Sequence, residues 1–274
     1  MHYDPIKQRL GRLFNRWLFT RRVFYRLLDV LLLRTWHIHR EIKRFTRETP
    51  PGSPVSVLDA GSGFGQYTYY LARKNKNWNI TAIDLKEEEI DSCRSFFEKS
   101  AIGHVRFQVE NLIRFSNKEA YDLILSVDVM EHIEEDRAVF VRFFESLKPG
   151  GLLLVNTPSD KGGSGVSHSA DVSFIDEHVR DGYSPEEIRQ KLREAGFSKI
   201  DTRYTYGWPG GLSWHLSMKY PIQMLGLSKF MLLLLPLYYL LVMPLSLILN
   251  MADVRMQHQS GTGLLVRAWK PSKQ

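Results

Sequence analysis

Apolar residues in the first fifty positions recur at the three- and four-residue spacing of a helix. One helical face collects Leu10, Leu13, Phe14, Trp17 and Leu18. A second, more apolar run covers Val23 to Leu33. The pattern predicts a helical arm over residues 1–49, followed by the proline-rich linker Glu48 to Pro54, which cannot continue a helix. Two placements are open: a helix pair packed on the main domain, or an amphipathic helix in a membrane surface.

The pattern then changes to a short buried strand, a glycine-rich turn and a helix. Val55, Val57 and Leu58 predict the strand, and Tyr67, Tyr70 and Leu71 mark one side of the helix. A second strand is predicted over Asn79 to Lys86. Strand, glycine turn and helix begin a Rossmann-type unit, so the sequence predicts an α/β fold.

Two acidic residues accompany the glycine turn. Asp59 ends the first strand, and Gly61, Gly63 and Gly65 follow it at alternate positions. Asp84 ends the second strand, nineteen residues after Gly65. Glycines let the backbone approach a ligand closely, and an acid at this distance can accept hydrogen bonds from ribose hydroxyls. The pattern predicts a nucleoside-containing ligand.

The order D-x-G-x-G-x-G resembles the class I S-adenosylmethionine-dependent methyltransferases, in the small-molecule group that includes ubiquinone and menaquinone biosynthesis enzymes. The resemblance covers about residues 50–207 and the last strand. It implies a Rossmann-like, seven-stranded sheet with helices on both faces and an antiparallel last strand. It implies S-adenosylmethionine as the cofactor, bound by Asp59, Gly61, Ser62, Gly63, Gly65, Asp84, Leu85, Asn111 and Asp128. The family usually has Asp where Asn111 stands, so the adenine contact there would be neutral.

Methyl transfer needs a base only when the acceptor carries a proton of high pKa. Three histidines are candidates for that base: His132, which follows the fourth predicted strand, and His168 and His178, which follow the fifth. Each can instead be a packing or loop-orienting residue. Asp128, Glu131 and His132 resemble a metal-binding set of some quinone enzymes, but Asp replaces the first Glu. We therefore predict no metal.

Charge is concentrated at the N-terminus. The net charge of +7 divides into +8 over residues 1–50 and −1 over the remaining 224 residues. A basic arm on a near-neutral body indicates an anionic partner, either phospholipid headgroups or nucleic acid. Cys93 is the single cysteine, and the N-terminus lacks a secretory-signal pattern. Both observations favour a cytoplasmic location.

The 22 residues from Phe230 to Met251 carry no charge and are long enough to cross a bilayer. The resemblance implies that Phe197–Tyr206 and Gly261–Lys270 are neighbouring strands, which excludes a single crossing between them. Two crossings need roughly 40 apolar residues. We therefore predict that residues 208–260 form a monotopic insert, broken or kinked at Pro236 and Pro244. The alternatives are a buried helix pair or a dimer interface.

These features divide the chain into a basic arm (1–49), a methyltransferase core (50–207 and 261–274) and an apolar insert (208–260). The predicted function is methylation of a lipophilic small molecule, such as a quinone precursor, lipid-linked phenol or pigment, on the cytoplasmic face of an anionic membrane. One alternative is RNA or protein methylation through the basic arm; it leaves the insert unexplained, which makes nucleic acid a weaker partner. Another is a non-catalytic, cofactor-binding scaffold.

Overall fold

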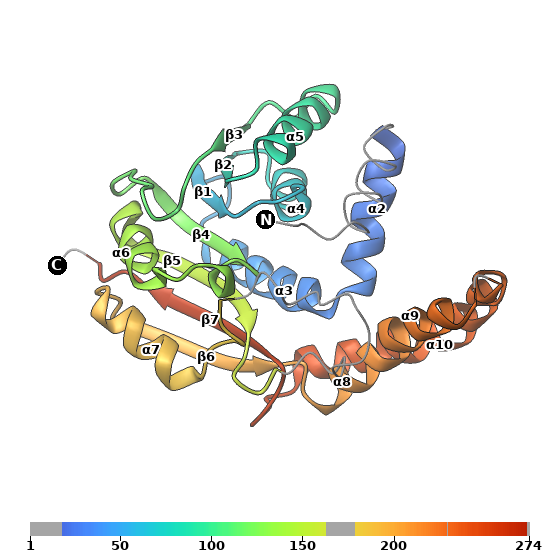
Figure 1. Ribbon diagram of the computed structural model, residues 1–274. Coiled ribbons are helices and arrows are strands. Elements are labelled where there is room, and N and C mark those ends of the chain that lie inside the picture. Colours follow the sequence, from blue (N-terminus) through green and yellow to red (C-terminus); the bar gives the residue numbers. More distant parts are fainter. Residues whose placement is uncertain (1–17, 163–178, 229, 273–274) are drawn as a thin grey trace.

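The computed structural model describes residues 18–162, 179–228 and 230–272. Its centre is a seven-stranded sheet in the order β3-β2-β1-β4-β5-β7-β6 (Figure 1). The strands β1 to β5 are parallel to one another, and β7 is antiparallel to both β5 and β6. The predicted fold class is confirmed. The strands are β1 (Val55–Ala60), β2 (Trp78–Asp84), β3 (Val105–Val109), β4 (Tyr121–Val127), β5 (Leu147–Pro158), β6 (Lys199–Thr205) and β7 (Gly263–Trp269).

Alternating side chains give the sheet two buried faces. In β5, Leu153 belongs to one apolar cluster and Leu154 to the other. Phe140 and Ile188 bring helices α6 and α7 to the first cluster, and Leu71 and Phe97 bring α4 and α5 to the second. The parallel strands are therefore covered on both sides, as such strands require. These helices are α4 (Gln66–Lys74), α5 (Glu87–Lys99), α6 (Asp136–Ser146) and α7 (Pro185–Glu194).

The described part of the N-terminal arm forms two helices, α2 (Leu18–Leu31) and α3 (Leu33–Glu48). Tyr25, Ile38 and Ile42 are buried in the same cluster as α4 and α5. The first placement open to the arm, packing on the main domain, therefore holds for residues 18–48. The earlier amphipathic stretch, residues 1–17, lies outside the described residues.

Between β6 and β7 the chain forms a helical hairpin, residues 208–255, that extends away from the sheet (Figure 1). The first half of the hairpin comprises α8 (Trp208–Trp214), the π-helical segment His215–Lys219 and α9 (Tyr220–Leu227), and α10 (Met231–Arg255) is the second half. The hydroxyls of Tyr238 and Tyr239 join the two halves by donating to the carbonyls of Leu216 and Ser217, at 2.7 and 2.9 Å.

The prolines do not divide the insert as the sequence predicted. Helix α10 continues through both Pro236 and Pro244. Each proline removes one backbone hydrogen bond. The remaining bonds of a 25-residue helix, together with packing against α8 and α9, keep the segment helical. Of the predicted break or kink at each proline, the break does not occur.

Much of α10 is exposed among the described residues. Its most apolar 18-residue window is only 11% buried within the chain, and Leu233, Leu240 and Leu241 are 78%, 72% and 71% exposed. By length and composition alone, α10 is sufficient to cross a membrane. The alternative of a helix pair buried within its own chain is therefore wrong for the hairpin as described.

Candidate functional site

The glycine turn lies where the carboxyl ends of β1, β2 and β4 meet, because these strands are neighbours in the sheet. Gly61, Gly63 and Gly65 have φ angles of +79°, +49° and +80°, a region that residues with a Cβ adopt rarely. The backbone N–H groups of Gly61 and Ser62 both donate to the carbonyl of Ile83, at 2.9 Å each. The turn is thereby held against the end of β2.

The two sides of the turn differ in free space. A Cβ on Gly61 would lie 2.4 Å from Cγ2 of Val129, whereas a Cβ on Gly63 would meet nothing within 4 Å. Glycine is therefore required at the first position by close packing, while the second opens outward. The open side is where a ligand can approach the backbone.

Asp84 is fixed beside this open side. Its Oδ2 accepts a hydrogen bond from the Gly63 N–H at 2.8 Å, and its Oδ1 accepts one from the Lys86 N–H at 3.0 Å. A carboxylate oxygen can accept a second bond. The carboxylate is therefore oriented and still able to accept from two neighbouring hydroxyls.

Asp59 is a buried carboxyl at the end of β1. Thr68 donates to its Oδ2 at 2.5 Å. Burial, and secondarily the negative charge of Asp84, raises the pKa of Asp59 to about 6. The nearby Ser62 hydroxyl is buried and has no hydrogen-bond partner among the described residues. The site thus offers groups that suit a ligand carrying both positive charge and hydroxyls, as S-adenosylmethionine does.

Leu85 and Asn111 follow β2 and β3. Leu85 is 60% exposed and can present an apolar surface to an adenine ring. The amide oxygen of Asn111 accepts a bond from the N–H of Ile113 at 2.9 Å, so any adenine contact through this oxygen would share it with the backbone. The roles of both residues stay predictions.

Asp128 brings the N-terminal arm into the site. It has a left-handed φ of +53° and accepts a hydrogen bond from the Asn156 side chain at 3.1 Å. It also forms an ion pair with Arg34 of α3. The Arg34 backbone N–H donates to the Tyr206 hydroxyl at 3.0 Å. This contact could not be predicted from the sequence pattern, because Arg34 and Asp128 are 94 positions apart.

Helix α2 contacts the glycine turn directly. The Tyr25 hydroxyl and Nη2 of Arg21 donate to the carbonyl of Phe64, at 2.5 and 2.8 Å. Nη1 of Arg21 also donates to the Ser92 hydroxyl of α5 at 2.8 Å. Arg21 is buried, unlike the water-facing arginines expected of an arm helix. The arm therefore supports the turn from outside.

The candidate bases differ in what the structure describes. His132 lies exposed in the short helix Met130–His132. His168 and His178 lie outside the described residues. Beside His132, Glu131 is buried and accepts a bond from the Thr157 hydroxyl at 3.1 Å. Burial, and then the charge of Asp128, raises the pKa of Glu131 to about 8.

The alternative metal set does not assemble. Across residues 18–162, 179–228 and 230–272, no three His, Cys, Asp or Glu side chains are grouped as metal ligands. Asp128 instead pairs with Arg34, and Glu131 is directed to Thr157.

Comparison with known families agrees with this geometry. A family described as "Methyltransferase domain" matches residues 52–198, which is more than half of the 274-residue chain. The chain belongs to this methyltransferase family. The match begins just before β1 and ends just before β6, so it contains every predicted cofactor residue and excludes the arm and the hairpin.

Curated relatives of this methyltransferase act on different acceptors. Phosphoethanolamine N-methyltransferase 3 of Arabidopsis thaliana is 33% identical over 149 residues, covering 53% of this chain and 29% of the relative. Ubiquinone biosynthesis O-methyltransferase of Rickettsia typhi is 27% identical over 107 residues, covering 38% and 42%. The chain thus spans less than half the length of these relatives.

Solved structures share the fold of the methyltransferase. Phosphoethanolamine N-methyltransferase 2 of Haemonchus contortus, in complex with S-adenosyl-L-methionine, has a TM-score of 0.59 at 18% identity, covering 91% of this chain and 60% of that one. The [4+2]-cyclase SpnF has a TM-score of 0.56 at 18% identity, covering 85% and 82%. The family and the first complex support S-adenosylmethionine as the cofactor. The cyclase illustrates that the fold alone does not fix the reaction.

Proposed function

We propose that the protein transfers a methyl group from S-adenosylmethionine to a lipophilic small molecule at a membrane surface. The observation that carries this proposal is the exposed apolar hairpin attached to a methyltransferase core. Between Trp208 and Ala252 the sequence contains two lysines and no acidic residue. A large exposed apolar surface marks a membrane or protein contact. The acceptor of a membrane-bound enzyme is most simply a molecule dissolved in the membrane.

The residues of the proposed site would have separate tasks. When bound, S-adenosylmethionine supplies a methyl group on a good, already charged leaving group. Asp84 would accept from the ribose hydroxyls, and Asp59 would oppose the positive charge of the cofactor. Gly63 would allow close backbone approach. These groups fix position, which supplies most of what an in-line displacement needs.

A proton must leave when the acceptor is a hydroxyl. His132 is the described candidate for receiving it, because it is exposed and follows β4 at the carboxyl edge of the sheet. His168 and His178 remain candidates from the sequence.

The hairpin would enter one leaflet and return. Because its ends join β6 and β7, which pair at Thr205 and Gly263, both ends lie at the same place on the core. Proposed partners are thus an anionic cytoplasmic leaflet, contacted by the hairpin (in the 208–260 insert) and the basic arm (1–49), and an acceptor reached from that leaflet. A quinone precursor, lipid-linked phenol or pigment fits the named quinone relatives.

A label-transfer assay tests the proposal. The protein is incubated with methyl-labelled S-adenosylmethionine and a total lipid extract, and separately with RNA and protein from the same cells. We expect label in the organic phase. Label only in macromolecules would contradict a lipophilic acceptor and favour RNA or protein methylation through the basic arm. Cofactor binding without transfer to any fraction would favour the scaffold.

A hairpin variant separates membrane contact from chemistry. We expect Leu233→Gln with Leu240→Gln to leave cofactor affinity unchanged and to lower turnover of the lipid-phase acceptor about tenfold or more, since two exposed apolar anchors are lost. The matched control is Val141→Gln, an exposed apolar residue of α6. Equal turnover by both variants would show that the hairpin is not how the acceptor is reached.

A further inference from the structure

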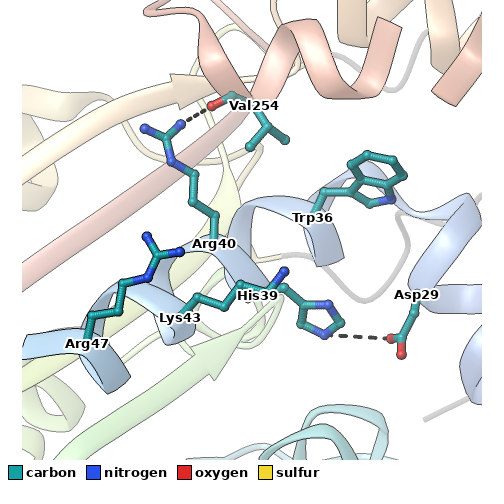
Figure 2. A pocket seen from close by; sticks show the side chains of 7 residues that line it. All are labelled: Asp29, Trp36, His39, Arg40, Lys43, Arg47 and Val254. Atoms are coloured by element: carbon teal, nitrogen blue, oxygen red, sulfur yellow. Dashed lines mark hydrogen bonds and ion pairs between the residues drawn. The ribbon is translucent and has the colours of Figure 1, made fainter. Parts of the chain in front are cut away.

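A cavity of 340 Å³ lies outside the cofactor site, between α2, α3 and the end of α10. Figure 2 shows its lining side chains, most of which project from α3. Nη1 of Arg40 donates to the carbonyl of Val254, which joins the cavity wall to α10. The residues that line it are Asp29, Trp36, His39, Arg40, Lys43, Arg47 and Val254.

The cavity is basic. Trp36, Arg40, Lys43 and Arg47 recur at steps of four, three and four residues, so they share one side of α3. Within the described part of the chain, Lys43 and Arg47 have no hydrogen-bond or ion-pair partner, and Figure 2 shows both without an interaction to another lining residue. Two long cationic side chains are therefore available to an anion at one opening.

Two other lining residues offset little of this charge. The Asp29 carboxylate already accepts from the Gln66 side chain at 2.8 Å, and His39 Nε2 is 3.8 Å from it. Burial lowers the pKa of His39 to about 3, with further contributions from Lys43 and Lys74, so His39 is neutral at pH 7. One carboxylate faces three cations, and the cavity keeps a net positive charge.

The position of the cavity indicates the source of the anion. Helix α10 exposes apolar side chains from Leu232 through Ile248 to Met251. Val254 lies one turn further, about 4.5 Å along the axis. A bilayer has the same order, in which hydrocarbon is followed directly by phosphate. Trp36 is a residue type typical of that boundary, and arginine forks bind phosphate in a bidentate way.

We propose that this basic cavity binds the phosphate of an anionic membrane phospholipid, whose headgroup carries no cation of its own, through Arg40, Lys43 and Arg47, while the lipid tails follow the exposed side of α10. The proposal rests on membrane contact by the hairpin and adds a second, polar point of attachment. It makes anionic lipid, and not only hydrocarbon, part of the binding surface. Two attachment signals hold a protein on a membrane far better than one.

Vesicle flotation of the full chain tests the proposal. Wild type is compared with the double variant Lys43→Gln, Arg47→Gln on vesicles of phosphatidylcholine, with and without phosphatidylglycerol. We expect the variant to lose about 30-fold in affinity for the anionic vesicles, since each basic residue near such a surface contributes about fivefold. On neutral vesicles we expect both proteins to bind equally.

The control is Lys99→Gln with Lys118→Gln, which removes the same charge from exposed positions outside the cavity. An equal loss in this control would overturn the cavity proposal in favour of general charge. Loss of RNA-oligonucleotide binding by the cavity variant, with vesicle binding intact, would overturn it in favour of nucleic acid. Failure of the wild-type protein to bind either kind of vesicle would instead contradict the membrane contact on which the proposed function depends.

Discussion

Leucine occupies opposite surroundings in the sheet and in the hairpin. Leu153 and Leu154 of β5 are at most 1% exposed, whereas Leu240 and Leu241 of α10 are more than 70% exposed. The sheet satisfies its apolar residues from both sides with its own helices, so nothing further is needed to bury them. In the hairpin, α10 packs against α8 and α9 but leaves many of its apolar side chains exposed. The core thus buries its own apolar residues, whereas the hairpin leaves an apolar surface that a membrane would cover under the proposed function.

The largest expected effect comes from truncating a leucine in each region. Leu153→Ala should lower the free energy of unfolding by about 2–5 kcal/mol, because it leaves a cavity between β5 and its covering helices. Leu240→Ala should change it by less than about 0.5 kcal/mol in water. Chemical denaturation of both variants measures this contrast. A comparable loss in Leu240→Ala would mean that the hairpin is buried in solution, as in a dimer interface.

A substitution at the junction of the hairpin and the core should cause the next largest loss of stability. Asp253 is fully buried and accepts from His37 Nε2 at 2.8 Å and from the Gly210 N–H at 3.0 Å. Because Arg203 donates to Nδ1 of His37 at 2.6 Å, the imidazole proton lies on Nε2. The Nε2–H group therefore donates a hydrogen bond to Asp253. Asp253→Asn places an amide donor among these donors and should cost about 2–3 kcal/mol.

Thermal or urea unfolding measures that loss. The control is Asp201→Asn, whose exposed carboxylate is 4.0 Å from Arg267 and should contribute less than about 0.5 kcal/mol. If Asp253→Asn is as stable as this control, the buried carboxylate of Asp253 does not stabilise the junction of the hairpin and the core.

The smallest effect should be a pH dependence confined to the core. The folded-state pKa of Asp59 is about 6, above its ordinary value of 3.8, so the folded protein holds more protons between these values. Stability should therefore fall as the pH rises from about 4 to about 6, by about 2 kcal/mol for this group. Asp59→Asn should flatten that part of the profile, and Asp91→Asn, at an exposed carboxylate, should not.

In a His215→Asn variant, vesicle binding by the hairpin should stay constant over the same pH range, because residues 208–252 then contain neither an acidic nor an imidazole side chain. Denaturation and flotation at matched pH values separate the two responses. A parallel fall in both would show that the regions titrate together.

The sequence predicted what depends on neighbouring positions. The turn from Asp59 to Gly65 and the acid Asp84 follow from local strand, turn and helix chemistry, and the seven-stranded sheet with its antiparallel last strand followed from resemblance to a family. The ion pair of Arg34 with Asp128 and the bonds from α2 to Phe64 could not be predicted, because they depend on how the arm packs. The prolines do not interrupt α10, because a 25-residue helix keeps most of its backbone hydrogen bonds when two are removed.

Strand β7 lies between β5 and β6 in the sheet, although it follows the hairpin in the sequence. During synthesis the ribosome therefore delivers the apolar hairpin before the strand that joins β6 to the rest of the sheet. For that interval the nascent chain presents its most aggregation-prone surface while its core is open. Early capture of the hairpin, by lipid or by a chaperone, would protect the chain until Gly263–Trp269 closes the fold.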